Sequence, residues 1–307
     1  MKLVSVRILL ILSLLAVVGN GGAITAQAAA ETPSANLTVE QWAGHSFVFH
    51  ALPADKQAAG YEIYTEGQAT QGFQGDPSVR IAYAEHVGKQ VTVTQVVPFT
   101  TGDNQYDYMV HMLVNDTGEK LVGRTVRGQL EGFVLAADLK NARQQFLGKT
   151  IYPKSRILSG LYIPGSNPNP TKVETQIGGP ATVIDVYTGI QSWEPIWLVV
   201  SANGQKAILP LAYSWTNMPV NAWTQSPPWQ DALFMEDPRL TSGWSQEVWN
   251  QIGSGNIQEG MTKEQVQLSW GKPVRTESDD TVWIYGTNKL SFSGEVLQTI
   301  ETLPTVE

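Results

Sequence analysis

The sequence predicts a mainly β protein that ends in a small α+β module. Three observations support this. Short runs rich in Val, Thr, Ile, Tyr and Trp alternate with Gly, Asn and Asp, these runs recur as an internal repeat, and helix-like patterning begins after residue 243. Because 307 residues exceed a typical single domain, we expect two or three modules.

The first thirty residues predict a secretory signal peptide. Two basic residues precede an apolar run from Ile8 to Val18, and Ala26-Gln27-Ala28 has the small residues that a signal peptidase requires. An uncleaved anchor is the alternative, but this run is short for a membrane-spanning helix, which needs about 20 residues. We expect residues 1–30 to be removed, and the remainder to fold in the periplasm or cell envelope after a linker over residues 31–41.

The chain has no cysteine, so outside the cytoplasm its stability must come from burial alone. We therefore expect neither a lipoprotein anchor, nor thiol catalysis, nor a cysteine-ligated metal. Loss of Lys2 and Arg7 with the signal peptide would change the net charge from −8 to about −10. Because nucleic-acid binding relies on clustered Lys and Arg, nucleic acid is not an expected partner.

An internal repeat predicts two copies of one β-module. Residues 87–96 align with residues 177–186 at a constant offset, and after a shortening of the chain residues 112–120 align with residues 198–206. Each copy has the pattern of short strands that are joined by tight turns.

The two copies are expected over residues 42–140 and 141–217. Asn203-Gly204 suits the two-residue turn of a hairpin in the second copy. Strands this short favour compact barrels, because closure removes exposed sheet edges. The segment Gly132–Leu139 resembles the end of bacterial SH3-like domains, and this resemblance implies two small SH3-like β-barrels.

Residues 218–243 predict a connector rich in proline and tryptophan. Five of the ten tryptophans lie in or near it, which is too many for a freely solvated tether. One interpretation is that they pack the connector onto the neighbouring modules. The functional alternative is an aromatic platform for a sugar or peptide, with Trp223 and Trp229 as candidate ligand-binding residues.

Residues 244–303 predict the α+β module. Ser245–Ile252 has the pattern of a short helix, and a second helix is expected after Thr262. Thr262 is placed as an N-cap, with Gln265 at the position that completes a capping box. Three strands are expected at Thr281–Tyr285, Lys289–Ser293 and Glu295–Ile300.

Four runs in this module carry a resemblance to a known family: Gly260–Val266, Gly271–Pro273, Trp283–Tyr285 and Leu290–Phe292. Together they resemble the SmpA/OmlA domain, named for a small assembly factor of the outer-membrane β-barrel assembly machine. The resemblance implies two helices packed on a three-stranded antiparallel sheet, a unit also similar to the repeated half of β-lactamase inhibitory proteins. Family members are typically lipoproteins anchored through a cysteine, which this chain lacks, so no functional site is carried over.

Residues suited to catalysis are few. His45 and His50 are five positions apart, a spacing that aligns them on neither a strand nor a helix, so a metal site is not expected. The sequence has no nucleophile elbow, phosphate-binding glycine loop or dinucleotide fingerprint. Asp279-Asp280 predicts a turn. We expect no catalytic residue and no cofactor.

The sequence therefore predicts a non-catalytic, exported cell-envelope protein that binds an envelope protein, a peptide or a cell-wall glycan. The first alternative is an inhibitor of a secreted enzyme, suggested by the similarity of the α+β module to such inhibitors. The second alternative is a hydrolase of envelope polymers, which would require two carboxylates that converge in a cleft. After signal cleavage, no integral membrane segment is expected.

Overall fold

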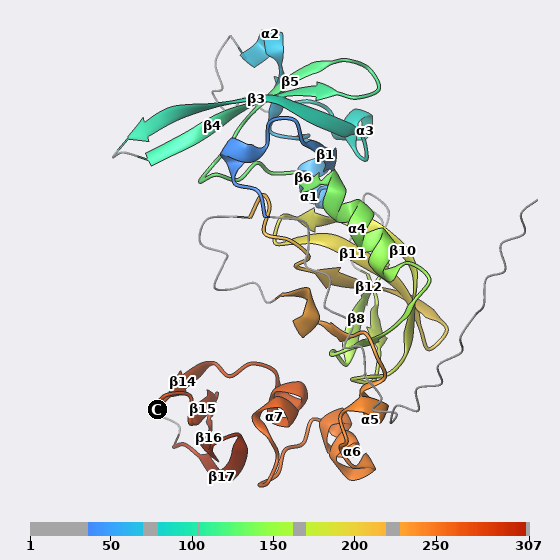
Figure 1. The fold of residues 1–307 in the computed structure, drawn as a ribbon, viewed down its shortest axis with the longest axis vertical. Helices are drawn as coiled ribbons and strands as arrows, with labels where there is room; N and C mark the ends of the chain where they lie inside the picture. Colours follow the sequence, from blue (N-terminus) through green and yellow to red (C-terminus); the bar gives the residue numbers. More distant parts are fainter. Residues whose placement is uncertain (1–35, 70–78, 103–104, 162–169, 219–227, 305–307) are drawn as a thin grey trace, which may run out of the picture. The chain divides into compact units, whose positions relative to one another are not determined.

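The computed structural model describes residues 36–69, 79–102, 105–161, 170–218 and 228–304. The predicted signal peptide and Trp223 lie outside these residues. Strands dominate the described chain and form three antiparallel sheets, the last of them in a carboxy-terminal α+β unit (Figure 1). The prediction of a mainly β protein with a carboxy-terminal α+β module is therefore confirmed.

The first sheet has six strands in the order β2-β5-β4-β3-β1-β6 and is curled. β3 and β4 form a long hairpin (Figure 1). Its inner part buries Val91 and Val93, while the outer part of β3 is largely exposed, so the hairpin extends beyond the core. The strands are β1 (Ser46–Phe49), β2 (Ile63–Thr65), β3 (Gln90–Gly102), β4 (Gln105–Val114), β5 (Lys120–Arg124) and β6 (Phe133–Leu135).

Aromatic packing forms the core of the first sheet. The ring centroid of Phe49 lies 4.7 Å from that of Tyr61 and 4.6 Å from that of Phe133. Gly132 has φ +92°, and a Cβ there would lie 2.6 Å from the Tyr61 ring, so this position requires glycine. Three short helices connect the strands: α1 (Ala54–Gln57), α2 (Glu66–Ala69) and α3 (Tyr83–His86).

The second sheet has seven strands in the order β13-β7-β10-β11-β12-β8-β9 and is also curled. Its central strand β11 is buried along most of its length, as its near-continuous apolar sequence requires. The strands are β7 (Thr150–Pro153), β8 (Ile157–Gly160), β9 (Lys172–Glu174), β10 (Ala181–Gln191), β11 (Glu194–Ala202), β12 (Gln205–Leu211) and β13 (Leu233–Phe234).

The two sheets repeat one strand order. β1, β3, β4, β5 and β2 of the first sheet correspond in pairing to β7, β10, β11, β12 and β8 of the second. Phe47 lies opposite Val91 in the first sheet, and Ile151 lies opposite Ala181 in the second. The outer edge is repeated as well, because β6 pairs with β1 and β13 pairs with β7.

Helix α4 (Ala136–Phe146) connects the two sheets and packs against β1 and β10. One hydrophobic cluster contains Val48 and Val134 from the first sheet together with Phe146 and the inner residues of the second. The module boundary expected between residues 140 and 141 lies inside this helix. The two sheets therefore meet at a shared hydrophobic cluster, and the first sheet also has a separate core of its own.

The carboxy-terminal unit begins after α5 (Pro238–Thr241) and contains α6 (Gln246–Ser254) and α7 (Lys263–Trp270). The predicted capping box is present: the Thr262 hydroxyl accepts a bond of 3.3 Å from the Gln265 amide, and the Gln265 side chain accepts one of 2.8 Å from the Thr262 amide. Val266 of α7 packs on the sheet, whereas α6 packs against Ile177 of the second sheet's unit.

The sheet of this unit has four strands, in the order β14-β15-β16-β17, so the prediction of three was wrong. β14 is Arg-Thr-Glu, with every residue exposed, and it has no apolar alternation from which a strand could be predicted. The bounds of the other three strands agree with the predicted ones to within two residues. The strands are β14 (Arg275–Glu277), β15 (Val282–Tyr285), β16 (Asn288–Ser293) and β17 (Val296–Thr302).

The turn predicted at Asp279-Asp280 is confirmed. Asp279 and Asp280 have φ +53° and +64°, in the left-handed region that Asp tolerates better than most residues. The Asp280 carboxylate accepts hydrogen bonds from Lys263 Nζ at 2.9 Å and Trp283 Nε1 at 2.7 Å. Asp280 therefore ties this turn to the first residue of α7 and to β15.

A buried carboxyl group lies at the start of α4. Asp138 has no exposed surface, and within the described residues neither of its oxygens has a hydrogen-bond partner of good geometry. Burial raises the pKa of Asp138 to about 7, although the Ser214 side chain favours the ionised form. The group therefore holds its proton through the mildly acidic range.

We predict that Asp138→Asn stabilises the protein at alkaline pH. Between the unfolded pKa of 3.8 and the folded pKa of about 7 the folded state binds the extra proton, so stability falls as pH rises through this range. Asparagine has no proton to lose. At pH 8 its free energy of unfolding should exceed that of wild type by up to about 4 kcal/mol, with little difference at pH 4. Urea denaturation across this range measures it, and a difference that does not change with pH would contradict it.

Candidate functional site

Two open grooves lie on either side of the turn that contains Arg127. The first, called here the aromatic groove, is defined by Glu40, Trp42, Tyr106, Tyr108, Arg127 and Trp215 and has a volume of about 730 Å³. The second, called the charged groove, is defined by His50, Lys56, Arg124, Arg127, Glu131 and Trp193 and has a volume of about 680 Å³. Both volumes are typical of ligand sites.

One wall of the aromatic groove comes from the short 3-10 helix η1 (Val39–Gln41) and from β4. Tyr108 donates a hydrogen bond to the Glu40 carboxylate, and this bond lowers the pKa of Glu40 and raises the pKa of Tyr108 to about 12. Tyr106 lies two positions away on the same face of β4, and its side chain is 59% exposed. The wall therefore presents an ionised acceptor beside two tyrosine rings.

Another part of the groove comes from the segment that follows β12 of the second sheet. The Trp215 amide donates to Asn36 Oδ1 at 2.7 Å, and the Leu37 amide donates to Thr216 Oγ1 at 3.0 Å. Asn217 is buried, and its side chain bonds both backbone groups of Leu130 at 2.8 and 2.7 Å. These bonds join segments far apart in the sequence, so the groove is assembled from both repeats.

The charged groove contains side chains of both signs. Three carboxylates line it, Asp55, Glu62 and Glu131. Glu131 forms an ion pair with Lys56, and Glu62 forms one with Arg80 at 3.5 Å. Two of the three carboxylates are therefore compensated by ion pairs within the groove or at its margin.

His50 lies beneath the charged groove and has no exposed surface. Its Nδ1 lies 3.3 Å from the carbonyl oxygen of Ala51, and Nε2 has no partner among the described residues. Burial lowers the pKa of His50 to about 4, so the ring is neutral at neutral pH.

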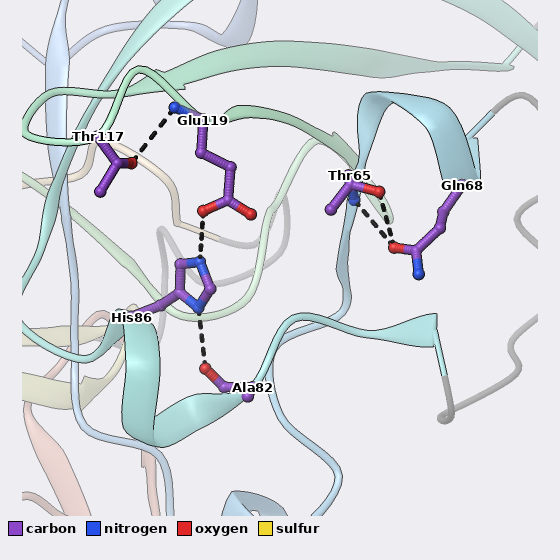
Figure 2. Close-up of polar contacts among 6 residues, drawn as sticks. All are labelled: Thr65, Gln68, Ala82, His86, Thr117 and Glu119. Carbon is purple, nitrogen blue, oxygen red and sulfur yellow. Dashed lines mark hydrogen bonds and ion pairs between the residues drawn. The ribbon is translucent and has the colours of Figure 1, made fainter.

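A second buried histidine, His86, lines neither groove. Figure 2 shows its polar contacts. Its Nδ1 is 2.9 Å from the Ala82 carbonyl and its Nε2 is 3.1 Å from the Glu119 carboxylate. Nearby, the Thr65 hydroxyl donates to Gln68 Oε1 at 2.9 Å (Figure 2). These contacts connect α3 to the segment before β5, so a structural role is enough to explain His86.

Trp229, one of the two tryptophans predicted as ligand-binding candidates, lines neither groove. Trp229 is 3% exposed and packs in the core of the second sheet, with its ring centroid 5.1 Å from that of Phe146 and 6.5 Å from that of Tyr213. Trp223 lies outside the described residues. The aromatic groove was not predicted from the sequence, although Tyr106 and Tyr108, two aromatics on one strand face, were a usable signal.

No protein-family model, curated protein or solved structure matches the chain. Among the described residues, no helix is long and apolar enough to cross a membrane. The same residues contain no cluster of three or more His, Asp or Glu side chains that could hold a metal ion. The function proposed below therefore depends on the geometry of the grooves.

We predict that His50→Gln reduces the loss of stability in acid. His50 takes up a proton near pH 6.5 in the unfolded chain and only near pH 4 in the folded chain, so its contribution to stability falls as pH falls between these values. The free energy of unfolding of His50→Gln minus that of wild type should therefore increase by about 3 kcal/mol from pH 7 to pH 4. Urea denaturation from pH 7 to pH 4 tests this, with His45→Gln at an exposed histidine as the control. Equal acid sensitivity of wild type and His50→Gln would contradict the prediction.

Proposed function

We propose that this protein is a non-catalytic binding protein of the cell envelope and that its aromatic groove binds a cell-wall glycan. The observation that carries the proposal is the grouping of exposed Tyr106 and half-buried Tyr108 and Trp215 around the ionised Glu40. Tyrosine and tryptophan present apolar faces with polar tips. Such faces suit the C–H surfaces of sugar rings, and the carboxylate suits their hydroxyl groups.

The location in the envelope follows from the predicted signal peptide over residues 1–30. It is also supported by the resemblance of residues 244–303 to the SmpA/OmlA domain, with its implied arrangement of two helices on a sheet. The two repeated sheets, which we propose to be related to SH3-like barrels, supply the groove. An envelope protein or a peptide is the alternative occupant.

Binding is favoured over catalysis by the state of the carboxylates in the charged groove. A glycosidase needs one carboxyl group that donates a proton and a second that acts as nucleophile or base. Two of the three carboxylates there, Glu62 and Glu131, are held in ion pairs with Arg80 and Lys56. Neither is placed as a free acid or base.

A hydrolase of envelope polymers is the second candidate, because three carboxylates share that groove. Under this hypothesis the purified protein would release soluble fragments from peptidoglycan, and Glu62→Gln with Glu131→Gln would abolish the release. We expect no release by wild type. Release that depends on these two residues would replace the binding proposal.

We predict that Tyr106→Ala weakens binding of the full chain to insoluble peptidoglycan. Removal of an exposed ring that stacks on a sugar should raise the apparent Kd about tenfold, which corresponds to about 1.4 kcal/mol. Co-sedimentation at increasing peptidoglycan concentration measures it. Tyr187→Ala is the matched control, because Tyr187 is 46% exposed on the second sheet and lies outside the groove. Equal affinities of the two variants would refute the placement of the site.

A further inference from the structure

Arg127 occupies a special position because it lines both grooves. It is exposed, and among the described residues it takes part in no ion pair. The carboxylate of Asp107 accepts hydrogen bonds from the Gly128 amide and the Thr125 hydroxyl, both at 3.1 Å, so it holds the turn itself. The guanidinium of Arg127 is thus left to face the grooves.

The backbone at Arg127 is strained. Val126 and Gln129 exchange backbone hydrogen bonds of 2.8 and 3.1 Å, and the two residues between them have φ +53° and +72°. These values define a two-residue turn in which Asn, Asp or Gly is strongly preferred at the first central position. Arginine stands there instead. A strained residue kept beside a groove is an observation that supports a functional role.

The aromatic groove contains one cationic side chain that offers a partner for a negatively charged ligand group. Its described lining holds one acidic side chain, Glu40, which is bonded to Tyr108, and one basic side chain, Arg127. The chain as a whole has a net charge of −8, so an anion needs a local cation to bind. A guanidinium presents a planar pair of donors that matches a carboxylate.

We propose that the glycan bound in the aromatic groove carries a carboxylate on its sugar chain and that Arg127 binds this carboxylate. Arg127 is then the residue that determines specificity for an acidic over a neutral glycan. This inference rests on the proposed function, because it names the ligand class of the same site.

The variant Arg127→Asn separates recognition from folding. Asparagine adopts positive φ readily and suits the turn, so the variant should fold with a Tm equal to or above that of wild type. It removes the guanidinium. Arg124→Gln is the matched control: it makes the same change of charge at an exposed arginine of the charged groove, which lies 4.6 Å from the centre of the Phe99 ring.

The experiment compares binding to native peptidoglycan and to the same material with its carboxylates converted to methylamides. Peptide-free glycan strands, native and methylamidated, form a second pair of samples that distinguishes sugar carboxylates from peptide carboxylates. Wild type and Arg124→Gln should bind both native samples at least tenfold more tightly than the capped ones. Arg127→Asn should have the same affinity for native and capped samples. That affinity should equal the affinity of wild type for capped material.

Each contrary outcome has a defined meaning. If wild type binds native and capped material equally, the proposed function stands and the role of Arg127 fails. If wild type binds neither, both fail. A preference for native material that survives in Arg127→Asn, or one that disappears when the peptides are removed, also overturns the inference.

Discussion

The packing of α4 against both sheets is the constraint on which the rest of the structure depends. Without cysteine, the chain is stabilised by burial, at about 25 cal/mol for each Å² of apolar surface removed from water. α4 places Phe146 in one cluster with Val48 and Val134 of the first sheet and the interior of the second. This arrangement buries one face of the first sheet against the second, while the other apolar residues of the first sheet form a cluster of their own.

The aromatic groove is lined by residues from both repeats. Its walls come from residues 36–40, from β4, and from residues 215–218, which lie on opposite sides of the duplication. The bonds of Asn217 to Leu130 and of Trp215 to Asn36 hold these walls together. Neither repeat alone supplies the rings and charges that the proposed glycan site needs.

Local features of this protein could be predicted from its sequence, whereas features assembled across the chain could not. The capping box at Thr262 and the turn at Asp279-Asp280 depend on a few neighbouring residues, and both were predicted. The exposed strand Arg275–Glu277 has no apolar pattern and depends on its pairing with β15. The aromatic groove joins three distant segments, and local spacing marks only the part with Tyr106 and Tyr108. Trp229 is buried by its contacts with Phe146 and Tyr213, which its own surroundings in the sequence do not reveal.

The two buried titratable groups, His50 and Asp138, affect proton binding in opposite directions over nearly the same pH range. In mild acid, His50 is neutral in the folded chain and protonated in the unfolded chain. Asp138 is protonated in the folded chain and ionised in the unfolded chain. Taken together, the pair gives the folded and unfolded chains nearly equal proton counts. The folded chain thereby carries two unfavourably buried groups, and together they give its stability little net dependence on pH in this range.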